Sequence, residues 1–374
     1  MTEDAIQFID LASQYQCLKL NIDRRIQSVL DHGQYIMGPE VAELEERLAS
    51  YVGVKNAITC ANGTDALHLA LMALGIGPGD AVFTTTFTFF ATAEVIALAG
   101  ATPIFVDIEP HTFNICPVKL EAKIKSVIGQ GVLDPKAIIA VDLFGLPADY
   151  RRLEPIASSY GIKLVEDAAQ GFGGEMDGRK AGSFGDVATT SFFPAKPLGC
   201  YGDGGAVFTN DDCLAELVRS CRLHGKGNDK YDNVRIGLNS RLDTIQAAIL
   251  LAKLDAFPME LVQRKAIAEE YNRALPEFCK TPAVPQNFSS AWAQYTARSE
   301  KRDWIKERLA SKNIPCGIYY KKCVHQQKAF HHIDIGENEL NEAELASQVV
   351  VSFPMHPYLP KESIDEIAST LVAE

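Results

Sequence analysis

Strand-type and helix-type segments alternate through the first 210 residues of the chain. Apolar strand-type runs occur at 57–61, 81–86, 102–108, 137–144, 163–167, 187–193 and 205–210. Helix-type runs lie between several of them, at 66–74, 91–99 and 150–160. Alternating strands and helices of this length predict an α/β domain with a mostly parallel sheet.

The pattern changes after a long helical run at 242–274, where Pro276, Pro282 and Pro285 mark a boundary region. Beyond the boundary we expect a strand at 292–298, a helix at 303–311, a strand at 314–320 and helices at 339–350 and 361–372. These elements predict a small α+β domain. We place the large α/β domain, with an N-terminal helical segment, at residues 1–255 and the small domain at 256–374.

Composition excludes several classes of partner. The formal net charge of −12 argues against binding nucleic acid or an anionic membrane surface. No apolar run approaches the ~20 residues that a membrane helix needs, and the acidic start lacks the basic region of a signal peptide. Nine cysteines without paired spacing, and histidines without metal-ligand spacing, predict reduced thiols in a cytoplasmic protein and no metal site.

Lys196 lies in the apolar, proline-bounded run Ser191-Phe-Phe-Pro-Ala-Lys196-Pro-Leu-Gly199. Burial lowers the pKa of a lysine and leaves a neutral amine that can attack a carbonyl. Asp167 ends the strand-type run Lys163-Leu-Val-Glu-Asp167, at the predicted rim of the sheet. Each residue alone fits a surface lysine or a helix cap, but a nucleophilic lysine and an aspartate for a pyridinium nitrogen are the two parts of a pyridoxal phosphate site.

Two further segments fit a flat, phosphorylated ligand. Gly63 and Thr64 join a strand to a helix, where backbone amides and the helix dipole favour an anion, although such a turn is often only a helix cap. Phe87 and Phe89 follow a strand end, where ligands of open α/β sheets bind. One of these rings is a candidate for stacking on a cofactor, and the alternative is an ordinary core aromatic.

Asn239 and Arg241 precede the long apolar helix. Ser240 between them can cap that helix, which would explain the segment structurally. An arginine fixed beside a helix start is also well placed to bind a carboxylate with two parallel hydrogen bonds. The residues alone leave both interpretations open.

The chain resembles the sugar-nucleotide aminotransferases of the DegT/DnrJ/EryC1/StrS family. The resemblance extends over nearly the whole chain and depends on six stretches in family order: 33–40, 61–67, 87–92, 166–170, 191–196 and 239–246. It implies the aspartate aminotransferase type I fold and pyridoxal 5'-phosphate as cofactor. Within the family, the stretches 200–210 and 353–359 favour the enzymes that aminate C3 of UDP-2-acetamido-2-deoxy-3-oxo-D-glucuronate, with L-glutamate as donor, in surface polysaccharide (O-antigen) biosynthesis.

The resemblance also implies roles for individual residues. Lys196 would bind the cofactor covalently, Asp167 would hold its ring nitrogen, Gln170 would lie by its phenolic oxygen and Phe89 would stack on its ring. The phosphate would be held by Gly63, Thr64, Ser191 and, from the neighbouring subunit of a homodimer with shared sites, Asn239. Arg241 of that neighbour would lie near the acceptor sugar.

The chain departs from the family pattern at Tyr319-Tyr320-Lys321, where the family has a His-Tyr-Pro run. We expect Tyr319 and Tyr320 to contact the sugar. Two other activities are compatible with the fold. One is a sugar dehydratase, in which histidine replaces the lysine, and the other is a non-catalytic regulator that binds the cofactor or a nucleotide sugar. The intact Lys196, Asp167 and Gln170 favour the aminotransferase, on this or another nucleotide-linked 3- or 4-keto sugar.

Overall fold

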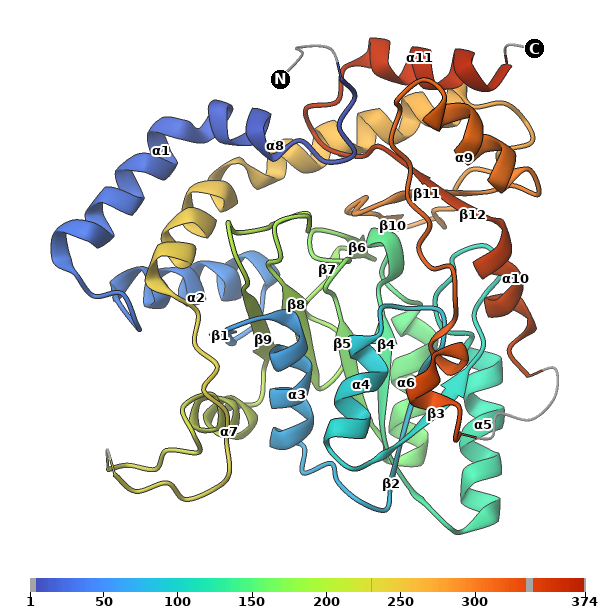
Figure 1. Cartoon of the computed structure of the whole chain (residues 1–374). Coiled ribbons are helices and arrows are strands. Elements are labelled where there is room, and N and C mark those ends of the chain that lie inside the picture. The colour runs from blue at the N-terminus through green and yellow to red at the C-terminus, as the bar shows by residue number, and fades with distance from the viewer. Residues whose placement is uncertain (1–4, 230, 334–338, 373–374) are drawn as a thin grey trace.

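A seven-stranded sheet forms the centre of the large domain in the computed structural model, which describes residues 5–229, 231–333 and 339–372 (Figure 1). Its strands lie in the order β1 (Asn56–Cys60), β9 (Gly205–Thr209), β8 (Val187–Ser191), β5 (Lys163–Asp167), β4 (Asp134–Val141), β2 (Asp80–Thr85) and β3 (Thr102–Val106). β8, β5, β4, β2 and β3 pair in parallel, and β9 runs antiparallel to both of its neighbours. The predicted mostly parallel sheet is confirmed.

Helices cover both faces of this sheet because successive strand residues point to opposite sides. On β4, Ile139 packs with α3 (Gly63–Ala73), α4 (Ala91–Leu98) and α7 (Asp212–Arg222), whereas Ile138 packs with α5 (Pro117–Gln130) and α6 (Tyr150–Tyr160). α2 (Pro39–Val52) and the first half of α8 (Thr244–Ala274) cover the β1–β9–β8 end. Both faces of the central strands are therefore buried.

The small domain is built around the antiparallel pair β11 (Tyr295–Arg298) and β12 (Val350–Phe353). α9 (Arg302–Ala310), α11 (Lys361–Val372) and the end of α8 pack on it through a core that includes Tyr271, Tyr295 and Phe353. α10 (Asn341–Val349) leads into β12. The predicted strand at 314–320 is wrong: only Gly317 bridges to the sheet, at Ser352, and the residues after it leave the sheet to line a cavity.

α8 continues without interruption across the predicted domain boundary at residue 255. Its residues 247–257 belong to the large-domain core and its residues 267–271 to the small-domain core. α1 (Leu11–His32) packs along α8 (Figure 1). The division into residues 1–255 and 256–374 stays a prediction.

Short elements complete the described chain. A three-stranded ribbon is formed by β10 (Phe288–Ser289), β6 (Glu175–Met176) and β7 (Arg179–Lys180). Single 3₁₀ turns are η1 (Leu143–Gly145), η2 (Val324–Gln326) and η3 (Lys328–Phe330). No helix in the described ranges combines the length and apolar character needed to cross a bilayer.

Candidate active site

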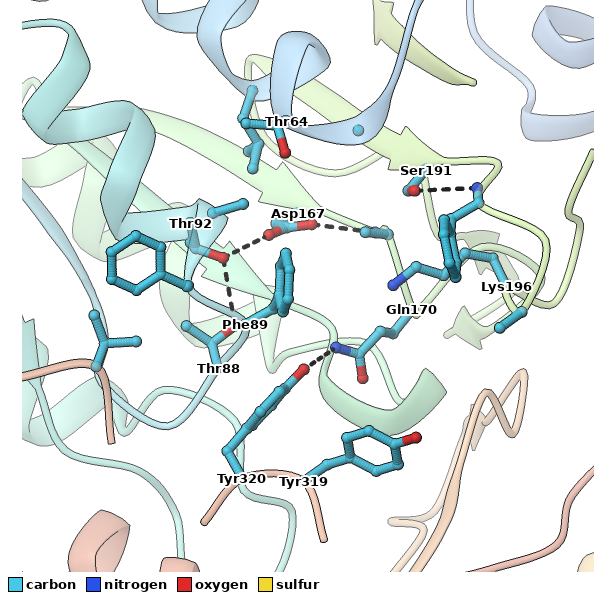
Figure 2. Close-up of a pocket in the computed structure, with 18 of the residues that line it drawn as sticks. Thr64, Thr88, Phe89, Thr92, Asp167, Gln170, Ser191, Lys196, Tyr319 and Tyr320 are labelled. Atoms are coloured by element: carbon cyan, nitrogen blue, oxygen red, sulfur yellow. Dashed lines mark hydrogen bonds between the residues drawn. The ribbon is translucent and has the colours of Figure 1, made fainter. Parts of the chain in front are cut away.

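A cavity of about 1090 Å³ opens at the carboxyl ends of β2, β5 and β8. Figure 2 shows its walls, which come from the start of α3, the segment before α4, the turn after β8 and the small-domain segment 318–327. Nine of the predicted site residues line it: Gly63, Thr64, Phe89, Asp167, Gln170, Ser191, Lys196, Tyr319 and Tyr320. The fold therefore brings residues from five separate stretches of sequence into one place.

The amino end of α3 forms an anion cradle on one wall. Asn62 caps the helix by accepting a hydrogen bond from the Asp65 amide at 2.7 Å. The amides of Gly63 and Thr64 have no acceptor within the described part of the chain and lie at the positive end of the helix dipole. A Cβ at Gly63 would come within 2.6 Å of the Ser191 side chain, so only glycine lets the helix start and the Ser191 hydroxyl converge.

Asp167 lies at the floor of the cavity with only 4% of its surface exposed. Its Oδ2 accepts a hydrogen bond from Thr92 Oγ1 at 3.0 Å and its Oδ1 from the Ala169 amide at 3.2 Å. Burial raises the pKa of this carboxyl, and the two hydrogen bonds and the charge of Lys196 oppose that effect. Sequence reasoning missed Thr92, although it ends a stretch that carries the family resemblance.

Lys196 extends into the same cavity from the turn after β8 (Figure 2). The turn is closed by hydrogen bonds from the Lys196 amide to the Phe193 carbonyl and from the Cys200 amide to the Phe192 carbonyl, both at 2.8 Å. Enclosure lowers the pKa of the Lys196 amine, and the nearby Asp167 carboxylate partly offsets that shift. The site thus holds an amine that loses its proton more readily than a surface lysine does.

Gln170 is oriented by partners on both sides. Its Oε1 accepts a hydrogen bond from the Phe144 amide at 2.8 Å, so its Nε2 faces the cavity and donates to the Tyr320 hydroxyl at 3.2 Å. Phe89 projects into the open space, with 57% of its surface exposed (Figure 2). Phe87, in contrast, is fully buried and packs edge-on against Phe144. Of the two candidate rings, Phe89 alone can stack on a ligand.

A buried pair of carboxyl groups lies behind Asp167, and the sequence had not indicated it. Glu166 accepts backbone hydrogen bonds from Gly182 at 2.7 Å and Phe184 at 2.8 Å. The Asp142 carboxyl interacts with that of Glu166, and its Oδ2 is a buried oxygen without a hydrogen-bond partner in the described ranges. Two carboxylate oxygens attract each other only when one carries a proton, and burial raises the pKa of both groups. We therefore expect this pair to bind a proton at a higher pH than exposed carboxyl groups do.

Asp142→Asn should flatten the dependence of stability on pH. With raised pKa values the folded protein binds more protons than the unfolded chain above pH ~4, so the free energy of unfolding falls as the pH rises toward neutrality. An asparagine oxygen can still accept the hydrogen bonds that Asp142 Oδ1 accepts from the Ala148 amide and the Tyr150 hydroxyl, and the amide does not titrate. Between pH 5 and pH 8 the wild type should lose about 1 kcal/mol or more relative to the variant in denaturant unfolding. Parallel pH profiles for the two proteins would contradict the raised pKa of Asp142.

Asn239 and Arg241 do not line the cavity of their own chain. They lie before α8, where Arg241 donates a hydrogen bond to Asn239. Ser240 is buried, and its hydroxyl oxygen accepts a hydrogen bond from the Ala61 amide at 3.2 Å, whereas the N-cap residue of α8 is Asp243. Within the described chain Arg241 forms no ion pair. A single subunit therefore does not bring these two residues to the cofactor-type site.

Comparison with known proteins agrees with this geometry. Residues 16–372 match the model of the DegT/DnrJ/EryC1/StrS aminotransferase family. The chain is 48% identical to UDP-2-acetamido-2-deoxy-3-oxo-D-glucuronate aminotransferase of Pseudomonas aeruginosa, over 98% of this chain and 99% of that protein. It is 38% identical to a UDP-N-acetyl-3-dehydro-alpha-D-glucosamine 3-aminotransferase of Acidithiobacillus ferrooxidans, over 99% and 98%.

Two solved structures are also similar to this chain in sequence and fold. A DegT/DnrJ/EryC1/StrS aminotransferase from Brucella abortus has 51% identity and a TM-score of 0.96, with 98% of both chains covered. NtdA from Bacillus subtilis, solved with bound cofactor PMP, has 28% identity and a TM-score of 0.86, with 98% of this chain and 83% of that chain covered.

The fold, the lysine and the aspartate in one cavity and the aminotransferases that the chain resembles together identify a pyridoxal phosphate-dependent aminotransferase. The chain belongs to the DegT/DnrJ/EryC1/StrS aminotransferase family. Three features of the cavity fit this cofactor. The α3 amides offer an anion site, Phe89 offers an open aromatic face, and Asp167 is a buried carboxyl that lacks a hydrogen-bonded cation.

Proposed function

We propose that this enzyme transfers an amino group from L-glutamate to the C3 keto group of UDP-2-acetamido-2-deoxy-3-oxo-D-glucuronate, for surface polysaccharide (O-antigen) biosynthesis. The observation that carries this proposal is the full-length similarity to an enzyme named for that substrate, combined with a cavity lined by all of the predicted cofactor-site residues except Asn239. The decisive test is turnover with glutamate on a panel of UDP-linked keto sugars, and the 3-oxo-glucuronate should give the highest kcat/KM.

The residues divide the catalytic work as follows. When bound, pyridoxal phosphate supplies an electron-accepting ring next to the carbon that loses its proton. Asp167 holds a negative charge beside the ring nitrogen and favours its protonated form. Lys196, with its lowered pKa, accepts and returns the proton at its Nζ. Gly63, Thr64 and Ser191 would hold the phosphate and Phe89 would stack on the ring. Gln170, which donates a hydrogen bond to Tyr320, would lie by the phenolic oxygen.

The competing activities give different results in simple assays. A neutral 3-keto or 4-keto sugar as the preferred acceptor would show an aminotransferase of other specificity. A regulator would bind cofactor, yet its visible absorption would not change when glutamate is added. Lys196 argues against the dehydratase, since in that group histidine stands in its place. An enzyme of the proposed kind loses its visible band with glutamate and recovers it with the keto sugar.

We also propose a cytoplasmic homodimer whose subunits complete each other's sites. Three exposed apolar side chains support this proposal: Phe193 lines the cavity, Ile36 lies before α2 and bridges to Asp243 at the start of α8, and Ile236, on the segment before α8, has 87% of its surface exposed. A second copy of the chain would bury them and bring Asn239 to the phosphate and Arg241 to the sugar. The nine cysteines are all free, which fits a reducing compartment.

Arg241→Ala tests the neighbour's contribution. A guanidinium binds a carboxylate with two parallel hydrogen bonds, so Arg241 should read the uronate carboxylate, while Tyr319 and Tyr320 position the sugar. Loss of a charged hydrogen bond should lower kcat/KM on the uronate by about 10- to 200-fold and on the matching neutral sugar much less. Equal losses on the two sugars would remove Arg241 as the carboxylate reader.

Mixing two defective variants tests whether one active site needs residues from both subunits. Lys196→Ala and Arg241→Ala subunits are each defective, but a mixed dimer contains one site with both residues intact. Random exchange should restore about a quarter of wild-type activity on the uronate. Failure to recover activity after exchange has been demonstrated would show that each subunit builds its own site.

A further inference from the structure

Lys321 and Lys322 line the rim of the active-site cavity, on the small-domain segment that follows Tyr320. Both side chains are exposed, and neither forms an ion pair within 4.0 Å or a side-chain hydrogen bond in the described part of the chain. The field of Lys321 reaches the exposed Asp303, which already pairs with Arg302 at 2.9 Å. The two ammonium groups are therefore available to a ligand.

The backbone that carries these lysines is held on both sides. Before them, Tyr320 accepts the hydrogen bond from Gln170, and Gly317 pairs with Ser352 through two hydrogen bonds of 2.8 and 2.9 Å. After them, the Val324 amide donates to the Thr86 carbonyl at 2.8 Å. A segment anchored in this way presents its lysines at a fixed place on the rim, while their long side chains stay adaptable.

His325, which follows the two lysines in the sequence, makes further contacts that hold this segment in place. Its backbone amide donates to Thr86 Oγ1 at 3.1 Å, its Nδ1 lies 2.7 Å from the same oxygen, and its Nε2 lies 3.0 Å from Glu344 Oε1. Since Thr86 directly follows β2, these contacts tie the segment to the large domain. The rim is thus attached to the same sheet that carries the rest of the site.

The charges around the cavity define what the pair can bind. Of the described lining residues, Asp65, Asp167 and Asp203 are acidic, and Lys196, Lys321 and Lys322 are basic. Lys196 and Asp167 lie at the floor, so the rim lysines are the cations that the described part of this chain offers to an anion at the cavity entrance. They must attract it against a net charge of −12.

We propose that Lys321 and Lys322 bind the diphosphate of a nucleotide-linked sugar and so select for a nucleoside diphosphate in the acceptor. This inference depends on the proposed function. A lysine binds phosphate as a mobile point charge, whereas carboxylate recognition favours the planar arginine fork. Two adjacent ammonium groups on a fixed backbone suit a flexible diphosphate better than they suit the single carboxylate of a sugar. Lysine at position 321, where the family has proline, gives this chain a cation that the family pattern lacks.

The test is binding of UDP, dTDP and uridine to the holoenzyme by titration calorimetry. Lys321→Gln/Lys322→Gln should bind the nucleoside diphosphates about 5- to 20-fold more weakly, as expected for two solvent-exposed ion pairs, and bind uridine as the wild type does. The salt dependence of UDP binding should become shallower in the variant. Lys321→Arg/Lys322→Arg should restore most of the affinity, and Lys312→Gln, an exposed lysine outside the cavity, should match the wild type.

Other results would overturn the proposal in distinguishable ways. Unchanged nucleoside diphosphate affinity in the double glutamine variant removes the lysine pair while leaving the proposed aminotransferase intact. A loss confined to the glutamate half-reaction assigns the pair to the amino donor instead. If the wild type binds dTDP but not UDP, the proposed nucleotide is wrong, and the affinities of the lysine variants for dTDP then test the lysine pair. If it binds neither, the nucleotide-sugar substrate and the lysine pair fail together.

Discussion

Lys196→Ala is expected to lower kcat for transamination by at least about 10³-fold, since one side chain serves as both nucleophile and base. The folded protein should persist, because the Lys196 side chain forms no hydrogen bond with the described part of the chain and its turn is held by backbone contacts. Activity with glutamate and the keto sugar is the measurement. Borohydride treatment of the holoenzyme followed by peptide mapping should place the pyridoxyl group on Lys196.

Lys253 provides the sharpest comparison for this assignment. It is also buried, with its pKa lowered by burial to about 8, but its Nζ donates to the Gly199 carbonyl at 2.6 Å and it does not line the cavity. A lowered pKa alone therefore does not select the reactive lysine. A pyridoxyl group on Lys253, or on the outlying Lys180 or Lys226, would overturn the site.

Asp167→Asn should retain the cofactor and lose at least ~100-fold in kcat, because an amide cannot stabilise a protonated ring nitrogen as a carboxylate does. The asparagine oxygen can still accept a hydrogen bond from Thr92 or Ala169, so the floor of the cavity should keep its shape. Turnover and the absorbance of the bound cofactor, measured together, separate lost chemistry from lost cofactor.

Thr92→Val is the matched control for that variant. It removes one hydrogen bond to Asp167 but keeps the charge, and we expect a smaller loss, about 10-fold. Near-wild-type kcat in Asp167→Asn would show that the carboxylate does not act on the ring nitrogen. A larger loss in Thr92→Val than in Asp167→Asn would show that the hydroxyl, not the charge, matters most.

The large domain was predictable because its pattern is local. Strand-type and helix-type runs alternate, and β4 carries adjacent isoleucines that pack on opposite faces, as a two-sided buried sheet demands. The segment 314–320 was wrongly predicted to be a strand, because its apolar run is typical of an edge strand. In the folded chain Ile318, Tyr319 and Tyr320 instead pack against large-domain aromatics and line the cavity.

From the sequence alone, residue types and motif order predicted Lys196, Asp167, Gln170 and the Gly63–Thr64 turn as cofactor-site residues, and all of them line one cavity. Tertiary structure alone decided which groups meet. It exposed Phe89 and buried Phe87, and it brought Thr92 within hydrogen-bond distance of Asp167. It also brought Asp142 near Glu166, and Lys321 and Lys322 to the rim of the cavity. The physical reason is that these contacts join residues far apart in the chain, and burial and charge then act over distances that no local pattern encodes.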